Sequence, residues 1–518
     1  MKGSEKLDKR GISIKGQGIF IVSAILSLGL AAWGIFGQKS AQAAATNAMT
    51  TIKSEFSWLY LGAMLVFVLL SLAIAISPLG RIRLGRDDEK PEVSLISWFG
   101  MLFGAGMGVG LVFWGCAEPL SHYIAPMGGI EPQSAESAAF AVRSSFIFMH
   151  WGLHPWACYV VLGLGLGVLA FRQGKPGMVS GLLSPLCRKH DTKLHRGIKA
   201  AVDTYTTVLT TVGVATSFGM GVLQISKGLN YLFGIPDTIY LWISLMIVIT
   251  FIYLKTAVSG INKGIKLLSN INMTLFTVLL LAVFIIGPTG EDIRILIVGM
   301  RDYLLNFFPD SLRLAAFDGS VNWIQDWRVF YWAWWLSWAP FVGFFIARIS
   351  RGRTVRQFII GAMVVPTVVG ILWFAAFGGL VFNVVDAFST EQLVALVASP
   401  ETTPFYIFQQ YQPLGAVLSI VAMLLLGTFF ITSANSATFV LGMITSNGDL
   451  NPPRHKKIFW GILIALVALA LILSGGLAMI QTMAIVIAFP YLFILLATCV
   501  SNVIVLVREY KALKQQKG

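Results

Sequence analysis

Residues 97–119 read SWFGMLFGAGMGVGLVFWGCAEP, an apolar run that is long enough to cross a bilayer but rich in glycine. Four glycines alternate with other residues at its centre: Gly104, Gly106, Gly108 and Gly110. Each costs a helix about 1 kcal/mol relative to alanine. Unwound backbone is tolerated at membrane depth only around a protein-lined cavity. We therefore expect a span that unwinds beside a cavity and stops at Glu118–Pro119, with close packing through small residues as the alternative.

The composition places the whole chain in a membrane. Of its 518 residues, 56% are hydrophobic and 12% are charged, and the mean hydropathy is +0.77. We identify twelve apolar stretches that approach or exceed the ~20 residues of a spanning helix. They are 19–36, 58–79, 94–116, 141–170, 200–225, 238–256, 268–288, 322–347, 357–382, 412–445, 458–476 and 478–507.

The net charge of +14 follows the topology of the chain and not a nucleic-acid partner. Most of the 38 Lys and Arg residues lie in every second connection and in both tails. Cytoplasmic loops carry such an excess, so both termini are expected in the cytoplasm of a multi-pass protein of the inner (plasma) membrane. A cleaved signal peptide ending near SAQAAATNA (40–48) is the alternative for the first span.

The chain divides into six predicted segments. They are a cytoplasmic tail (1–18), two accessory spans (19–93), a five-helix repeat (94–288), an external amphipathic segment (289–321), a second five-helix repeat (322–507) and a short cytoplasmic tail (508–518). Interrupted helices at matching places in two halves are typical of inverted-repeat transporters.

Aromatic residues cluster in two spans. The fourth contains HWGLHPWACY (150–159), in which Trp156 and Tyr159 share one helical face and Trp151 lies more than a turn away. The eighth contains FYWAWWLSWAPF (330–341). There, the positions i, i+3 and i+6 form one stripe, which consists of Trp332, Trp335 and Trp338. Trp334 lies off this stripe and is the tryptophan most easily explained by packing.

The charges around the two aromatic clusters indicate which class of substrate they bind. The middle of every expected span lacks Asp, Glu, Lys and Arg, and Arg143 and Arg328 stand near helix starts, where they can snorkel. Aromatic cages bind quaternary ammonium groups. Without an acidic counter-charge, a zwitterion that brings its own carboxylate fits better than choline. Packing and membrane-interface roles are the alternative for each tryptophan.

The tenth span offers hard oxygen ligands. Thr432 and Ser433 lie side by side in GTFFITSANSAT (427–438). Their hydroxyls suit Na⁺, although such residues commonly bond to carbonyls of their own helix. The four cysteines form no CxxC pair, so no other metal or cofactor is expected. An enzyme is not expected either, because buried acids, metal ligands and an activated nucleophile are lacking.

The chain resembles the betaine/carnitine/choline transporter family from about residue 15 to 507. Four motifs carry the likeness: GMGVG (106–110), HWGLHPWA (150–157), FYWAWWLSW (330–338) and ARISRGRTVR (347–356). The resemblance implies an all-α integral membrane fold of twelve transmembrane helices. It also implies a LeuT-type 5+5 inverted repeat preceded by two extra helices, and assembly as a homotrimer in membrane lipid.

The resemblance also implies site residues. Those for substrate are Trp151, Trp156, Tyr159, Trp332, Trp334, Trp335, Trp338, Met107, Gly108 and Gly110. Those for sodium are Gly104, Met107, Phe429, Thr432 and Ser433. Gly110, where choline-preferring members tend to have Asp, favours a betaine. A second sodium site matches at Thr210 but not at Val214, so its presence is left open.

The expected function is sodium-coupled symport of glycine betaine, or a similar quaternary-ammonium zwitterion, by alternating access for osmoprotection. Two alternatives remain within transport: a sodium-independent carnitine or betaine exchanger, and a choline transporter. A membrane sensor that binds betaine without moving it is the alternative of another class.

Overall fold

A computed structural model describes residues 17–106, 108–143, 145–187, 192–258, 264–314 and 320–517. Within these ranges the chain is helical and contains no β-strand; an isolated bridge pairs Arg83 with Thr354. The expectation of an all-α fold is confirmed. Most of the first tail, 1–18, lies outside the described residues.

Ten α-helices form the first half of the described chain, up to residue 258, and two short ones among them divide the expected span 94–116. They are α1 (Gly18–Phe36), α2 (Gln38–Ile76), α3 (Leu95–Gly106), α4 (Val109–Ile124), α5 (Ala135–Arg143), α6 (Ser145–Trp151), α7 (Leu153–Gly167), α8 (Val179–Leu182), α9 (Lys193–Phe233) and α10 (Ile239–Val258).

The helices of the second half include the longest in the chain. They are α11 (Gly264–Ile286), α12 (Thr289–Leu305), α13 (Phe307–Ser311), α14 (Val321–Trp323), α15 (Phe330–Arg348), α16 (Val355–Phe382), α17 (Thr390–Ala398), α18 (Thr403–Gln409), α19 (Gly415–Ile444) and α20 (Arg454–Lys517). Short 3₁₀ helices η2 (Pro78–Arg81), η4 (Ser184–Leu186) and η6 (Val385–Ala387) and π-helices η3 (Val168–Arg172) and η5 (Ile324–Val329) complete the order.

Ten helical segments of the described chain are long and apolar enough to cross a membrane. The ten do not include α3 and α4, which are each shorter than a span. They count α20 once, although its 64 residues bend at Gly475 and Gly476, whose φ values of +157° and +59° are not helical. The protein is therefore a multi-pass membrane protein, as its composition predicts.

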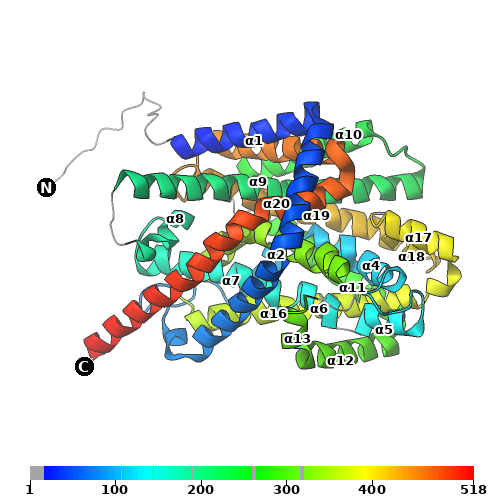
Figure 1. Ribbon diagram of the computed structural model, residues 1–518, viewed down its shortest axis with the longest axis horizontal. Helices are drawn as coiled ribbons and strands as arrows, with labels where there is room; N and C mark the ends of the chain where they lie inside the picture. Colours follow the sequence, from blue (N-terminus) through cyan, green and yellow to red (C-terminus); the bar gives the residue numbers. More distant parts are fainter. Residues whose placement is uncertain are drawn as a thin grey trace.

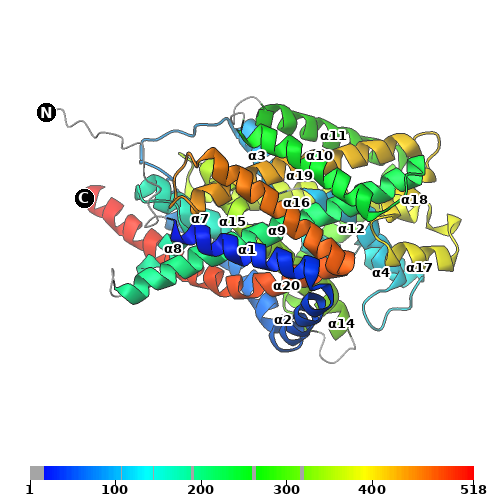
Figure 2. The same cartoon turned by 90° about the horizontal axis from the view of Figure 1, so that it is seen from above.

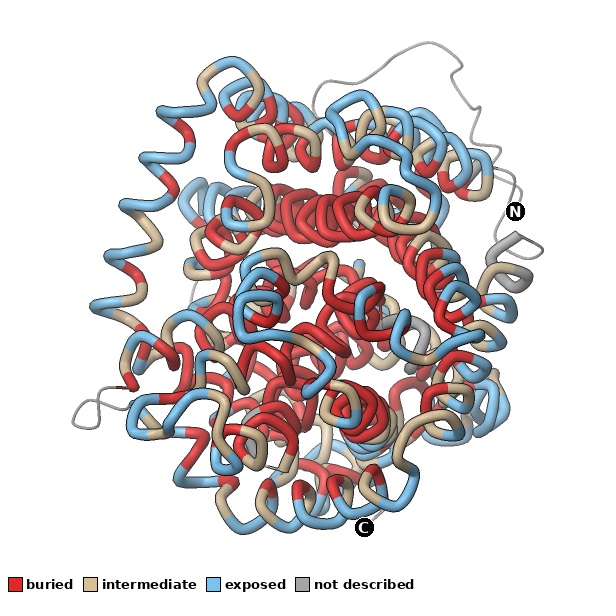
Figure 3. Tube along the Cα trace, turned by 90° about the vertical axis from the view of Figure 1, so that its right-hand side faces the viewer, coloured by how far each residue is buried: buried red, intermediate tan, exposed pale blue. Residues whose placement is uncertain are grey.

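The bundle has a central and an outer set of helices (Figures 1 and 2). In the spans containing α9 and α15, 94% of the most apolar stretch is buried, compared with 17% in α10 and 22% in α11. Figure 3 shows the buried residues gathered along the central helices. Since α7, α15 and the middle of α9 (206–224) are buried on nearly every side, the side chains there contact protein and not lipid.

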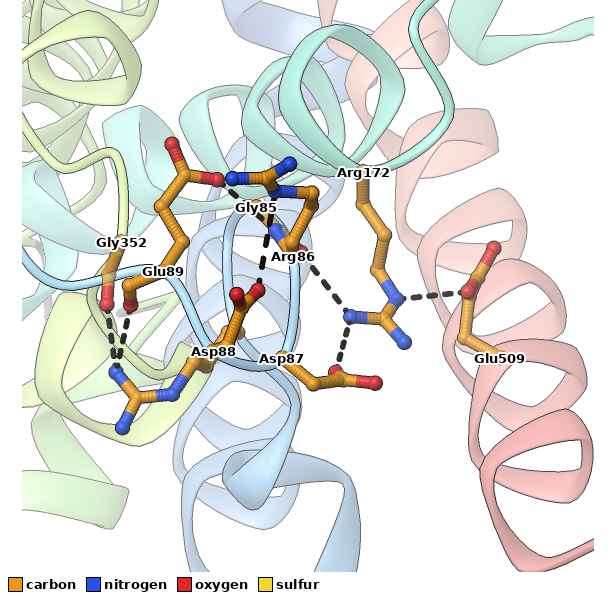
Figure 4. Close-up of polar contacts among 9 residues, drawn as sticks. Gly85, Arg86, Asp87, Asp88, Glu89, Arg172, Gly352 and Glu509 are labelled. Atoms are coloured by element: carbon orange, nitrogen blue, oxygen red, sulfur yellow. Dashed lines mark hydrogen bonds and ion pairs between the residues drawn. The ribbon is translucent and has the colours of Figure 1, made fainter. Parts of the chain in front are cut away.

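One end of the bundle carries a network of charges (Figure 4). Here α1 begins and α20 ends (Figure 1). Arg172 at the end of η3 bonds to Asp87 at 2.8 Å and to Glu509 of α20 at 2.7 Å. Arg351 pairs with Glu89 at 2.6 Å. These pairs, which we call the end cluster, connect the loop after η2 with α20 and with the α15–α16 turn.

Candidate functional site

The interruption expected from the glycine pattern lies between α3 and α4. α3 ends at Gly106 and α4 begins at Val109; Gly108 between them is extended, with φ −143° and ψ −149°. A Cβ atom on Gly108 would lie 3.2 Å from the Trp338 ring and 3.7 Å from Ser433 Oγ. Glycine therefore lets this backbone lie against both α15 and α19. Met107 lies outside the described residues.

The expected stop at Glu118–Pro119 is wrong. α4 continues to Ile124 with Pro119 inside it. Proline is tolerated in membrane helices, because neighbouring groups satisfy the freed backbone. The continuation places Glu118 inside the helix bundle, where the sequence analysis expects no acid.

A second interruption, which the sequence analysis does not predict, separates α6 from α7 at Gly152. A Cβ atom there would lie 2.3 Å from the carbonyl oxygen of Phe148 and 2.7 Å from the hydroxyl of Tyr303. The backbone N–H of Leu153 donates to that hydroxyl at 3.0 Å. The break brings Trp151, the last residue of α6, to the same ring cluster as the α7 aromatics.

Trp335 of α15 is the centre of this cluster. Its ring centroid lies 5.4 Å from that of Trp151, 5.9 Å from that of Trp156 and 5.7 Å from that of Tyr159. All four side chains are at most 5% exposed. We call these four residues the aromatic cage.

The cage holds polar edges without partners. Within the described chain, the indole N–H groups of Trp156 and Trp335 and the hydroxyl of Tyr159 have no hydrogen-bond partner. Buried polar side-chain atoms are usually paired. These three groups can therefore bond to a ligand or water, as can the indole N–H groups of Trp332 and Trp334, which also have no partner in the described chain.

The other tryptophans of α15 differ from their expected placement. Trp334 lies against the cage, with its ring centroid 6.2 Å from that of Trp151. Trp332 instead stacks on His154 at 5.2 Å. At about 100° per residue, positions 332 and 338 are about 120° apart around a helix, whereas 334 and 338 are only about 40° apart. The i, i+3, i+6 stripe therefore drifts off the face that carries Trp334 and Trp338.

Gly110 borders the cage, whereas Trp338 contacts α9. The Trp338 indole donates to the carbonyl of Gly213 in α9 at 2.9 Å. A Cβ atom on Gly110 would lie 2.3 Å from the Trp334 ring and 3.0 Å from the Trp151 ring. Any larger residue at 110 therefore displaces a ring of the cluster.

Glu118 and Arg328 are fully buried, contrary to the sequence analysis. Glu118 is 0% exposed and accepts hydrogen bonds from the Trp151 indole at 2.9 Å and the Tyr331 hydroxyl at 2.5 Å. Arg328 is also 0% exposed and donates to the carbonyl oxygen of Asp310 instead of snorkelling. A carboxylate therefore lies one indole ring away from the cage centre.

The expected sodium residues are described in part. Gly104 lies in α3, and Phe429, Thr432 and Ser433 lie in α19. The Thr432 hydroxyl donates to the carbonyl of Thr428 at 2.8 Å and accepts from Asn272 of α11 at 2.7 Å. The Oδ1 atom of Asn272 is buried and has no partner in the described chain. The hydroxyl, amide and carbonyl oxygens of these residues are the kind of ligand that a hard cation such as Na⁺ prefers.

The partly matched second sodium position is different. The Thr210 hydroxyl donates to the carbonyl of Thr206 at 2.7 Å within α9, and Val214 offers no oxygen. The contacts of the described chain place no cluster of further oxygen atoms around either residue.

Two cavities lie away from the cage. One of about 740 Å³ lies among α7, α9 and α20, and one of about 630 Å³ lies between α12 and α16. No cage residue lines either of them. The cage rings are packed against one another and are buried.

Sequence reasoning missed Glu118, Tyr331 and Asn272. Glu118 and His122 stand four residues apart on one helical face, which is a signal for an interacting pair. Tyr331 and Asn272 carry no local signal, because their partners come from other helices.

Comparison with known proteins identifies the family of the chain. The model of the betaine/carnitine/choline family transporters matches residues 18–511. The glycine betaine transporter OpuD of Bacillus subtilis is 42% identical over 96% of both chains. The ectoine/hydroxyectoine transporter of Virgibacillus pantothenticus is 39% identical over 90% of this chain and 91% of its own. A glycine betaine/proline/choline transporter of Vibrio parahaemolyticus is 36% identical over 90% and 86%.

Proposed function

Since the chain belongs to the betaine/carnitine/choline transporter family, whose members are transporters and not enzymes, we propose that it is a sodium-coupled symporter. Its substrate is glycine betaine or a similar quaternary-ammonium zwitterion. It works in the plasma membrane by alternating access, with both termini in the cytoplasm. Relatives named for glycine betaine favour this substrate class.

The single observation that carries the proposal is the contact of Trp335 with three other cage rings. A quaternary ammonium group has no N–H to donate, so it is recognised by π-faces. Each desolvated contact contributes about 2 kcal/mol or more. The trimethylammonium head occupies the cage, and the N–H groups at the unwound backbone near Gly108 meet the carboxylate.

The buried Glu118 changes one premise of the sequence analysis. An acid does lie near the cage, so the preference for a zwitterion no longer follows from the absence of a counter-charge. The carboxylate of Glu118 contacts the N–H edge of Trp151 and not an open ligand space. The zwitterion preference now rests on Gly110 and on the substrates for which the relatives are named.

The sodium part of the proposal rests on oxygen donors beside the unwound backbone. Ser433 lies near Gly108, and Asn272 has an unpaired Oδ1 next to Thr432. These residues, with backbone carbonyls of α3 and α19, would hold Na⁺. A cation there supplies charge that stabilises the break between α3 and α4, and this couples ion binding to the shape of the cage.

The finer architecture belongs to the same proposal. α3 and α4 together form one broken span, and the bend at Gly475–Gly476 divides α20 into two, which gives twelve transmembrane helices. Five of them from α3 to α11 and five from α15 to α20 form a LeuT-type inverted repeat after α1 and α2. The assembly is a homotrimer, as the family resemblance implies.

The cage is tested by Trp335→Leu, which keeps apolar bulk and removes a π-face. We expect the KM for glycine betaine uptake to rise about 30-fold, the equivalent of one lost cation–π contact. Trp460→Leu is the matched control, because Trp460 of α20 is likewise buried but donates its indole N–H to Thr445, away from the cage. It is expected to change KM less than twofold. An unchanged KM in Trp335→Leu rejects the cage.

Sodium coupling is tested with purified protein in sealed proteoliposomes. We expect glycine betaine to accumulate with an inward sodium gradient and not when potassium replaces sodium. Exchange for internal substrate without sodium would identify an exchanger, preferential uptake of choline would identify a choline transporter, and binding without flux would identify a sensor.

A further inference from the structure

Glu118 is the most heavily hydrogen-bonded buried carboxylate near the cage. Its Oε2 accepts from the Trp151 indole at 2.9 Å and from the Tyr331 hydroxyl at 2.5 Å. Its Oε1 lies 2.7 Å from Nδ1 of His150 and 3.4 Å from Nε2 of His122. A carboxylate offers about four lone-pair positions. Protein groups therefore occupy most lone-pair positions of the Glu118 carboxylate, which leaves little capacity for direct contact with a ligand.

The partners of Glu118 connect three helices around the cage. Glu118 lies in α4, Trp151 ends α6 and Tyr331 belongs to α15. The Tyr331 ring stacks on His150 with centroids 4.5 Å apart and lies 5.5 Å from the Trp151 ring. Trp151 in turn contacts Trp335. The orientation of one cage wall therefore depends on a single carboxylate.

We infer that Glu118 is a positioning residue that fixes the Trp151 ring and enriches its π-face for a cationic head group. The inference rests on the proposed function and adds a specificity element to the same site. The attraction between a cation and a ring comes from the negative face of the π-system. A carboxylate at the N–H edge pushes electron density toward that face, and the low dielectric of the buried site preserves the effect.

A metal centre is the competing explanation for part of this cluster. Glu118, His122 and His150 offer ligand atoms within 4.8 Å of one another. Metal-bound histidines normally donate their second ring nitrogen to an outer partner. Nδ1 of His122 and Nε2 of His150 have no partner in the described chain, so a hydrogen-bonded carboxylate explains the geometry better.

The test uses Glu118→Gln, which keeps shape and removes charge, and Glu118→Asp, which keeps charge and withdraws the carboxylate from Trp151. Both variants, reconstituted in proteoliposomes, are compared with the wild type. We expect each to raise the KM for glycine betaine about tenfold while Vmax changes less than twofold. Choline, used as a competitor, should lose affinity by the same factor as glycine betaine, because the carboxylate acts through the ring.

Other results would overturn the inference. If Glu118 were a direct counter-ion, Glu118→Gln would weaken choline far more than the zwitterion. A purely structural role would lower Vmax or stability with KM unchanged. Bound metal in the purified wild type, with a KM that rises after chelation, would identify a metal centre. If Glu118→Gln does not fold, Glu118→Asp decides, since an unchanged KM there rejects positioning.

The fate of the proposed function is read separately. If Trp335→Leu raises KM and the Glu118 variants do not, the cage is supported as the substrate site and the positioning role of Glu118 is rejected. If Trp335→Leu leaves KM unchanged, the cage itself is wrong, whatever the Glu118 variants show.

Discussion

Glu118 in α4 and Asp292 in the first turn of α12 are both 0% exposed, but their surroundings differ. Glu118 is surrounded by donors on both oxygens. Neither carboxylate oxygen of Asp292 has a hydrogen-bond partner in the described chain, and Oδ1 points at Gly379 of α16, where a Cβ atom would lie 1.8 Å away. Burial alone therefore does not determine the role of a carboxylate, because that role also depends on the hydrogen-bond donors around it.

The two sites also differ in what they imply for charge. Donors around a buried carboxylate favour its ionised form, whereas burial without donors favours the neutral form. Asp292 lies outside the membrane-spanning segments, and burial raises its pKa to about 7. The carboxyl group near the cage is thus held by hydrogen-bond donors, whereas burial without donors raises the pKa of the carboxyl group in α12.

The largest effect is expected for Glu118→Ala. The change leaves the Trp151 indole, the Tyr331 hydroxyl and His150 without their acceptor, so we expect a loss of about 3–5 kcal/mol of unfolding free energy. Thermal unfolding in detergent measures it, and added salt should change it little. Glu136→Ala on the exposed face of α5 is the control, expected within about 0.5 kcal/mol of the wild type. Equal values for the two variants would show that the Glu118 network adds no stability.

An intermediate effect with the opposite sign is expected for Asp292→Asn. At pH 8 the wild type holds an unpaired buried charge, so the neutral amide should stabilise the protein by about 1–3 kcal/mol. The same unfolding assay measures it. A destabilised variant at pH 8 would mean that the carboxylate has a favourable partner and that the comparison with Glu118 is wrong.

The pH dependence of the wild type sharpens the same contrast. The folded pKa of Asp292 is raised to about 7 from an ordinary value of 3.8. The folded state therefore binds more protons between these values, and stability present below pH 4 is lost as the pH rises to about 7. The Tm should be higher at pH 5 than at pH 8, and Asp292→Asn should reduce this difference. If the Tm changed equally with pH in the wild type and in Asp292→Asn, the pH dependence would come from another titrating group.

The smallest effect is expected in the end cluster. Arg172→Gln breaks the partly exposed pairs with Asp87 and Glu509. Such pairs contribute about 0.2–1 kcal/mol and are screened by salt. The difference from the wild type should shrink toward zero in 1 M NaCl, whereas that of Glu118→Ala should persist. Lys511→Gln on α20 is a control of equal charge. A salt-independent loss in Arg172→Gln would mean that the end cluster behaves as a buried site.

Sequence patterns predicted what local spacing determines. The glycine alternation placed the break near Gly108, and the three-residue spacing brought Trp156 and Tyr159 together. Spacing failed at Trp332 and Trp334, because an i, i+3, i+6 stripe drifts around the helix and one partner ring comes from α6. Glu118 was missed because Pro119 resembled a helix stop, although neighbouring helices let α4 continue. Contacts between distant helices, such as Tyr331 with Glu118, leave no local pattern.

The central claim is that the methylated head of the substrate is held by the cage rings. The most direct measurement titrates the purified protein, in sodium, with glycine betaine, dimethylglycine, sarcosine and glycine while tryptophan fluorescence is recorded. The account predicts affinity that falls with each methyl group removed, by at least about tenfold from glycine betaine to glycine. Equal affinity for glycine and glycine betaine would contradict it.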